Sequence, residues 1–195
     1  MRSKTLVTQA ICIKNKNEAG TNVALFKNTM SSLENNKPSF IVDVHLGKLA
    51  RTLRMLGFDT LYNNSYTKND LIQIALADKR LLCTKNVALE KFPGVTAIII
   101  NSADPMQQLL QVVNDLSLVN NLIPFSRCLV CNGELKMVQK EEIKDALLLK
   151  TKLYYNEFWQ CTICKKIYWK GPHYERMMAL VENLKTGKNL NSTII

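Results

Sequence analysis

The sequence predicts an α/β protein, with a parallel sheet flanked by helices and a small cysteine-rich module after it. Between residues 40 and 118, short apolar stretches alternate with segments of helical periodicity, which is typical of repeated β-α units. Two CxxC pairs follow, each beside a strand-like pattern. We therefore divide the 195 residues into an N-terminal arm, an α/β domain, a cysteine-rich module and a C-terminal tail, with bounds of 1–38, 39–126, 127–178 and 179–195.

The composition is typical of a globular protein, with 47% apolar and 22% charged residues. No apolar run approaches the roughly 18 residues that a membrane span needs. The beginning of the chain lacks the apolar core and the cleavage site of a signal peptide. The arm is rich in Asn, Lys and Ser, and it holds one possible strand over residues 6–13. We expect a cytoplasmic protein without membrane contact.

The first β-α unit has the strongest pattern. The apolar stretch FIVDV (40–44) predicts a buried strand, and the segment 45–57 predicts a helix that ends at Gly57. The leucines of this helix recur at helical spacing on one face. We expect its basic residues on the opposite, outer face, namely Lys48, Arg51 and Arg54.

Further β-α units follow along the chain. The next strands are expected over 58–62, 80–84 and 95–101, and the next helices over 67–79, 86–92 and 104–118. Thr67 or Asn69 is a suitable N-cap for the first of these helices, and Asp104 followed by Pro105 begins the last. Units of this length favour a parallel sheet with helices on both faces.

Polar side chains stand where the predicted strands end. Ligands of open α/β sheets bind at the carboxyl ends of the strands, which places Asp43, Asn86 and Asp104 at one rim, with Asp70 beside it. Converging carboxylates repel one another unless a hard cation such as Mg²⁺ or Mn²⁺ neutralises them, and water on such an ion is a source of nucleophile. Simpler roles stay open, because Asp43 could be an N-cap or an ion-pair partner, and Asp70 and Asp104 could only serve the starts of their helices.

The cysteines give a second candidate site. Two CxxC pairs, separated by 29 residues, have the spacing of a four-cysteine zinc ribbon: Cys128, Cys131, Cys161 and Cys164. Four thiolates fill a tetrahedral shell, so we expect a structural rather than a catalytic zinc, with an iron–sulfur cluster as the alternative. Cys12 and Cys83 have no partner at ligand spacing and are expected to be small buried side chains.

The net charge of +10 is concentrated at the two ends of the chain, because residues 1–39, 40–126 and 127–195 carry +4, +1 and +5. Basic flanks around a nearly neutral centre suit a polyanion, although lysines can also simply solubilise a surface. His45 is expected in a solvated or supporting role near the rim. His173 lies among aromatic and basic residues, which either pack the cysteine-rich module against the body or stack on RNA.

Four segments of the chain, taken together, resemble a known family. The segments FIVDVHLGKLARTLRMLGFDT, RLLCTKNVAL, PFSRCLVCNGELKMVQKEE and EFWQCTICKKIYWKGPHYERM resemble the Mut-seven C-terminal ribonuclease family, a PIN-like nuclease domain with a C-terminal zinc ribbon, over residues 40–178. The resemblance implies RNA cleavage that depends on Mg²⁺ or Mn²⁺. It implies that Asp43, Asp70 and Asp104 are the acidic ligands. One position departs, because the family motif Thr-basic-Asp reads Thr84-Lys85-Asn86 here.

The sequence thus predicts a metal-dependent endoribonuclease in which Asn86 completes the acidic rim. The residues expected to hold the RNA backbone are Lys48, Arg51, Arg54, Lys165, Lys166 and Lys170. The alternative is a weakened or inactive RNA-binding module, because Asn86 replaces an expected acid. A small-molecule enzyme lacks support, since GxGxxG and GxxxxGK[ST] are absent. A protein partner such as an antitoxin is conceivable, but no residue identifies one.

Overall fold

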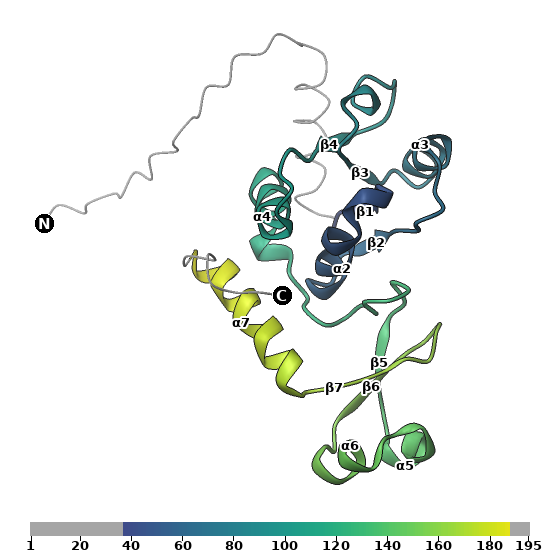
Figure 1. Ribbon diagram of the computed structural model, residues 1–195, viewed down its shortest axis with the longest axis vertical. Coiled ribbons are helices and arrows are strands. Elements are labelled where there is room, and N and C mark those ends of the chain that lie inside the picture. The colour runs from purple at the N-terminus through teal and green to yellow at the C-terminus, as the bar shows by residue number, and fades with distance from the viewer. Residues whose placement is uncertain (1–36, 188–195) are drawn as a thin grey trace, which may run out of the picture.

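A four-stranded parallel sheet forms the centre of the α/β domain. The computed structural model describes residues 37–187, and the strands of this sheet lie in the order β2-β1-β3-β4 (Figure 1). Their bounds are Ser39–Val42 for β1, Asp59–Leu61 for β2, Leu81–Thr84 for β3 and Ala97–Ile99 for β4. Every pairing is parallel, so the predicted sheet flanked by helices is confirmed.

Helices cover both faces of this sheet, as the alternation of its buried side chains requires. Phe40 and Val42 of β1 point into a core formed with α2, α4 and α7, whereas Ile41 points into a second core with α3. The α-helices have the bounds Gly47–Met55 for α2, Lys68–Ala77 for α3, Pro105–Asp115 for α4 and Pro172–Thr186 for α7. Short 3₁₀ helices are η1 (Val44–Leu46), η2 (Val87–Leu89) and η3 (Leu118–Asn121).

Gly57 lets the chain after α4 lie directly against the end of α2. Its φ of 89° is in the left-handed region, and a Cβ at this position would lie 2.0 Å from the carbonyl oxygen of Ile123. The backbone N–H groups of Ile123 and Phe125 donate to the carbonyls of Leu56 and Met55. The segment that leads from the α/β domain to the cysteines is therefore fixed to α2.

An antiparallel three-stranded sheet forms the cysteine-rich module, which we call the ribbon (residues 127–170). Its strands are β5 (Leu135–Val138), β6 (Phe158–Cys161) and β7 (Ile167–Trp169), in that order. Between β5 and β6 the chain forms α5 (Lys140–Ile143), η4 (Lys144–Ala146) and α6 (Leu149–Tyr154). Figure 1 shows α5 and α6 at the end of the ribbon that lies away from the α/β domain.

The last helix returns from the ribbon to the α/β domain. Helix α7 lies beside α4 in Figure 1, and its residues Leu180, Val181 and Leu184 are buried in the same core as α2 and α4. The segment from residue 179, which the sequence predicted to be a tail, therefore begins with a helical, core-forming stretch up to Thr186. The possible strand 6–13, Cys12 and the last eight residues lie outside the described residues.

Candidate active site and metal centre

Asp43 directly follows β1 at the carboxyl edge of the sheet. It is only 7% exposed. Its Oδ1 accepts a hydrogen bond from the backbone N–H of His45 at 3.1 Å, so the carboxylate caps η1. Its own N–H donates to the carbonyl of Cys83, which extends the β1–β3 ladder by one residue. The N-cap role that the sequence left open is therefore real, and it holds a nearly buried carboxylate at the strand end.

Thr84 joins Asp43 to Asn86. The hydroxyl of this fully buried threonine donates to Asp43 Oδ2 at 2.6 Å and accepts from the backbone N–H of Asn86 at 3.0 Å. Asn86 itself is exposed, and its Oδ1 accepts from the N–H of Ala88, which caps η2. Thr84 thus links the carboxylate of Asp43 to the backbone of Asn86, whose own side-chain oxygen is used in the cap of η2.

The strand order explains why this pair meets. The chain goes from β1 to β2 on one side and returns to β3 on the other side of β1. The gap between the carboxyl ends of β1 and β3 is therefore the switch point at which open α/β sheets bind ligands.

The sequence identified Asp43 and Asn86 as candidate site residues but did not identify Thr84 as the side chain that links them. The signal that could have found it is a hydroxyl at the end of a wholly apolar strand.

Asp70 and Asp104 lie at the same edge, and each serves its own helix. Asp70 Oδ2 accepts from the N–H and the hydroxyl of Thr67 in a capping box, and these two hydrogen bonds lower the pKa of Asp70. Asp104 is the N-cap of α4, and its Oδ1 accepts from the N–H of Gln107 at 2.8 Å. The capping roles that the sequence left open for both residues are present.

The described residues do not gather the three carboxylates into one cluster. Among residues 37–187, the four cysteines are the only group of three or more His, Cys, Asp or Glu side chains close enough to hold a metal ion. Asp70 follows β2 and Asp104 follows β4, which are the two outer strands of the sheet. These strands are three strand spacings apart, which is about 14 Å. Asp43 and Asn86 lie between them. The donor types, carboxylate and amide oxygens, fit Mg²⁺ or Mn²⁺, but an ion at Asp43 would need the outer carboxylates to turn inward or to bind through water.

The basic residues predicted on the outer face of α2 separate into two kinds. Lys48 in the first turn of α2 and Arg51 in its middle are exposed. Arg54 is buried, with 4% exposure, so its predicted place on the outer face is wrong. Its guanidinium donates to the carbonyl oxygens of Thr60, Leu129 and Val130, because this part of α2 faces the ribbon rather than solvent. Arg54 therefore joins the two parts of the molecule.

The lysines predicted on the ribbon are exposed, namely Lys165, Lys166 and Lys170. Lys170 forms an ion pair with Glu157 and lies 5.2 Å from the centre of the Trp159 ring. His45 and His173 are exposed as well. Next to His173, the ring of Tyr174 packs on Phe125 with 4.6 Å between centroids, which is the packing role that the sequence offered for this cluster.

The four predicted cysteines converge in the ribbon. Their sulfur atoms all lie within 4.8 Å of one another. The distance from Cys128 Sγ to Cys164 Sγ is 3.6 Å, and that from Cys131 Sγ to Cys161 Sγ is 3.4 Å. A tetrahedral zinc with bonds of about 2.3 Å separates its sulfur ligands by about 3.8 Å. The four cysteines could therefore hold a structural metal such as zinc.

Polar groups around this cluster favour one thiolate in particular. Burial opposes the anion, but the Tyr168 hydroxyl and the backbone N–H groups of Cys131 and Val130 together lower the pKa of Cys128 to about 6. Tyr168 also bonds the N–H of Leu129, so one side chain from β7 supports the first CxxC turn. Cys83 differs from these four cysteines, because its complete burial raises the pKa of its thiol to about 12. It lies in the core, so the prediction of a small buried side chain is confirmed.

A recess lies at the opposite end of β1 from Asp43. It has a volume of about 540 Å³ and separates the amino end of the sheet from the ribbon. It is lined by Lys37, Pro38, Ser39, Gly57, Asp59, Ile123, Ser126, Arg127, Glu134, Leu135 and Lys136. Because β1 lies between the two, this recess is separate from the acidic edge, the name we give to the carboxyl edge of the sheet with Asp43, Asp70, Asn86 and Asp104.

No helix within residues 37–187 has the length and apolarity to cross a membrane.

The chain is similar to a known protein family. Residues 38–181 match the family model described as the Mut7-C RNAse domain. The match spans the sheet, the ribbon and most of α7. Neither the curated proteins nor the solved structures contain a significant match.

Proposed function

The chain belongs to the Mut7-C RNAse domain family, and on this premise we propose that it is a metal-dependent endoribonuclease with its active site at the carboxyl edge of β1 and β3. The observation that carries the proposal is the nearly buried Asp43, held by Thr84 and placed beside Asn86 at the switch point of the sheet. A carboxylate at this place has a fixed orientation before any ligand binds, which lowers the cost of assembling a site.

Asp43 is the central ligand for Mg²⁺ or Mn²⁺ in this proposal. Asn86 adds an amide oxygen, and Asp70 and Asp104 complete the rim from the two sides. When bound, the ion supplies an activated water and stabilises charge on the phosphate. Thr84 keeps Asp43 oriented toward the edge. In Asp70 and Asp104, one carboxylate oxygen serves the helix cap, and the other accepts no hydrogen bond from residues 37–187.

The RNA backbone is proposed to lie across the basic residues that remain exposed. Lys48 and Arg51 stand on α2 next to the candidate edge, and Lys165, Lys166 and Lys170 stand on the ribbon. Contacts of this kind make affinity fall with rising salt. The ribbon metal is proposed to be zinc, since four thiolates leave no open position for chemistry.

The test is cleavage of single-stranded and structured RNA in Mn²⁺ by the full chain. Asp43→Asn keeps the size of the side chain but removes its charge and one of the two oxygens that accept from His45 and Thr84, so we expect the rate to fall by about 10²-fold or more. Asp145→Asn removes the same charge from an exposed position in η4, and its rate should stay within about twofold of wild type. Equal activity of Asp43→Asn and wild type would overturn the site.

Asn86 favours a second candidate, an RNA-binding module with lost chemistry. An amide adds no negative charge to the rim, and its oxygen already caps η2. The variant Asn86→Asp distinguishes the two functions. If wild type binds RNA but does not cut it, and Asn86→Asp cuts it, the binding module is correct. If wild type cuts and Asn86→Asp cuts only about tenfold faster, the enzyme is correct and Asn86 is a weaker ligand.

A further inference from the structure

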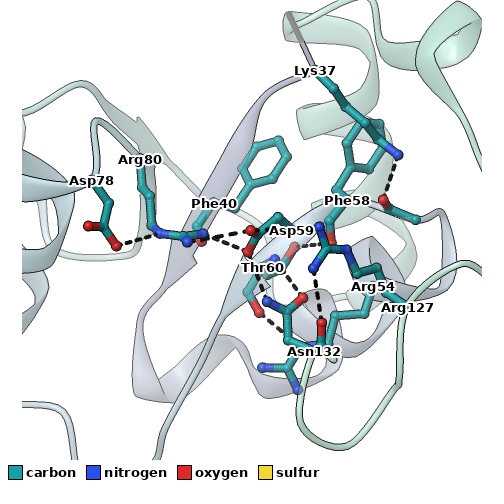
Figure 2. A network of polar contacts seen from close by, with 11 residues as sticks. Lys37, Phe40, Arg54, Phe58, Asp59, Thr60, Asp78, Arg80, Arg127 and Asn132 are labelled. Atoms are coloured by element: carbon teal, nitrogen blue, oxygen red, sulfur yellow. Dashed lines mark hydrogen bonds and ion pairs between the residues drawn. The ribbon is translucent and has the colours of Figure 1, made fainter. Parts of the chain in front are cut away.

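We propose that Arg54 and Asn132 couple metal binding in the ribbon to the stability of the α/β domain, so that the metal holds together both parts of the molecule. This goes beyond the proposed nuclease activity and rests on a metal bound by the four cysteines. Figure 2 shows the contacts, in which Arg54, Asp59 and Thr60 meet Arg127 and Asn132. We call residues 128–132 of the ribbon the first turn.

Arg54 depends on the first turn for most of its hydrogen bonds. Its Nη1 donates to Val130 O at 2.8 Å and to Leu129 O at 3.3 Å, and its Nε donates to Thr60 O at 2.9 Å. Leu129 and Val130 are the two residues between Cys128 and Cys131. Their carbonyls face Arg54 only while this turn keeps its shape, and a metal bound by Cys128 and Cys131 fixes that shape.

Asn132 makes the second connection. Its Oδ1 accepts from the backbone N–H of Thr60 at 2.9 Å, and its Nδ2 donates to Asp59 Oδ1 at 2.8 Å. Both partners belong to β2, the edge strand of the parallel sheet. The residue directly follows Cys131 and has a φ of 71°, so its backbone conformation belongs to the turn that the cysteines form.

Neither Arg54 nor Asn132 offers a ligand to the metal, yet Arg54 loses two of its three acceptors and Asn132 loses its contacts with β2 if the first turn opens. A guanidinium that is 4% exposed would then keep only Thr60 O as an acceptor, and the N–H of Thr60 would lose its acceptor. Leaving buried polar groups without partners is costly. The α/β domain is therefore less stable without the metal, and, by linkage, Arg54 increases the affinity for the metal.

The coupling reaches the candidate active site through one continuous segment. The chain runs from Asp43 through η1 into α2, which carries Arg54 one residue before its end. A first turn that opens would remove the support of α2 on the ribbon side. Arg54 is a positioning residue in this proposal, since it touches neither the metal ligands' sulfur atoms nor the acidic edge.

The experiment measures zinc affinity and stability in the full chain. Arg54→Met fills a similar volume without donors, and Arg51→Met removes the same charge from an exposed position of the same helix. Zinc affinity is measured by competition with a chromophoric chelator. We expect Arg54→Met to bind zinc about tenfold or more weakly and Arg51→Met to bind it within about twofold of wild type. Arg54→Met should also unfold at lower denaturant than wild type when zinc is bound, and this difference should shrink when zinc is removed.

Several results would overturn the coupling. These are an unchanged zinc affinity in Arg54→Met, an equal loss in Arg51→Met, or a stability difference that is the same with and without zinc. A wild-type chain that binds no zinc would overturn the metal assignment and the coupling with it, while leaving the RNA cleavage test unaffected. If Arg54→Met does not fold, Asn132→Gly replaces it, because glycine suits the φ of 71° and removes both side-chain hydrogen bonds. The same weaker binding is expected for that variant, and unchanged binding would reject the proposal.

Discussion

The two candidate metal sites differ in how completely the polypeptide assembles them. In the ribbon, four sulfur atoms already lie within 4.8 Å of one another. At the acidic edge, Asp43 and Asn86 meet through Thr84, while Asp70 and Asp104 stay in their caps. The cysteines come in pairs from two short turns that adjoin the antiparallel sheet, whereas each acid comes from a different β-α connection. Ligands that share a turn are placed by local geometry, and ligands from separate strands are placed by the order of the sheet.

The difference also appears in what surrounds each site. The first turn of the ribbon is closed by its own backbone, because the N–H of Cys128 bonds Gly133 O and the N–H of Asn132 bonds Cys128 O. It is then held from outside by Arg54 and Tyr168. At the acidic edge, Asp43 accepts from Thr84 of a neighbouring strand, whereas the hydrogen bonds to Asp70 and Asp104 come from the starts of their own helices. The ribbon cluster is therefore assembled by the fold itself, whereas the acidic edge would need its outer carboxylates to turn inward before they could share an ion.

The largest effect is expected from breaking the ribbon site. Cys128→Ser replaces a buried ligand, and we expect zinc to fall from about one per chain to nearly none, with loss of ordered structure in the ribbon. Metal content after gel filtration and the near-ultraviolet circular dichroism measure this. Cys83→Ala is the matched control, because it also changes a fully buried cysteine but should keep its zinc. Retention of zinc by Cys128→Ser would show that the four sulfur atoms are not the metal ligands.

Much of this contrast could be predicted from the sequence. The CxxC spacing identified all four cysteines because two residues between ligands define a local turn. The β-α alternation predicted the sheet, and Asp104 with Pro105 predicted the beginning of α4. The order β2-β1-β3-β4 was not predictable from the local pattern, since it depends on which strands pair across the whole domain. For that reason the rim residues were named correctly as neighbours of strand ends, but their separation was not foreseen.

The error at Arg54 has a related cause. Helical periodicity assumes one apolar partner and one solvent face. Helix α2 has two partners, the sheet and the first turn of the ribbon, and the second offers carbonyl oxygens rather than apolar side chains. A basic side chain can donate hydrogen bonds to those carbonyl oxygens. The burial of this helix face therefore leaves no apolar residue in the sequence that would predict it. In the same way, the polar segment from residue 182 to 186 obscured the buried Leu184 of α7.

The next largest effect concerns the support of Asp43. Thr84→Val removes the 2.6 Å hydrogen bond to a nearly buried carboxylate, so we expect the free energy of unfolding to fall by about 1–3 kcal/mol. If the proposed function is correct, RNA cleavage should fall with it. Thr84→Ser keeps the hydroxyl and should recover most of the cleavage rate, which separates the hydrogen bond from the packing of the methyl group. A Thr84→Val variant as active as Thr84→Ser would mean that Asp43 needs no orientation by this residue.

A smaller effect is expected at the contact between β2 and the ribbon. Although partial burial opposes the charge, hydrogen bonds from Arg80 and Asn132 hold the pKa of Asp59 below its usual value. A lowered pKa means that this contribution to stability is present above about pH 4 and is lost as the pH falls through the folded-state pKa. We therefore expect Asp59→Asn to lose about 1 kcal/mol at pH 7 and to approach wild type as the pH falls below the folded-state pKa of Asp59. Urea unfolding at several pH values measures this, and Asp145→Asn, which removes an exposed carboxylate, is a control that should stay close to wild-type stability at pH 7.

The smallest effect tests whether a cap and a ligand can share one carboxylate. Thr67→Ala removes the N-cap of α3 and its hydroxyl bond to Asp70, while the backbone N–H of residue 67 can still donate. We expect the Tm to fall by about 2–4 °C and the pKa of Asp70 to rise toward its usual value. Differential scanning fluorimetry and NMR titration measure these two changes. The carboxylate of Asp70 remains, so RNA cleavage should stay within about twofold of wild type. A much larger loss of cleavage in Thr67→Ala than in an equally destabilised variant would show that the cap itself sets the position of Asp70 at the acidic edge.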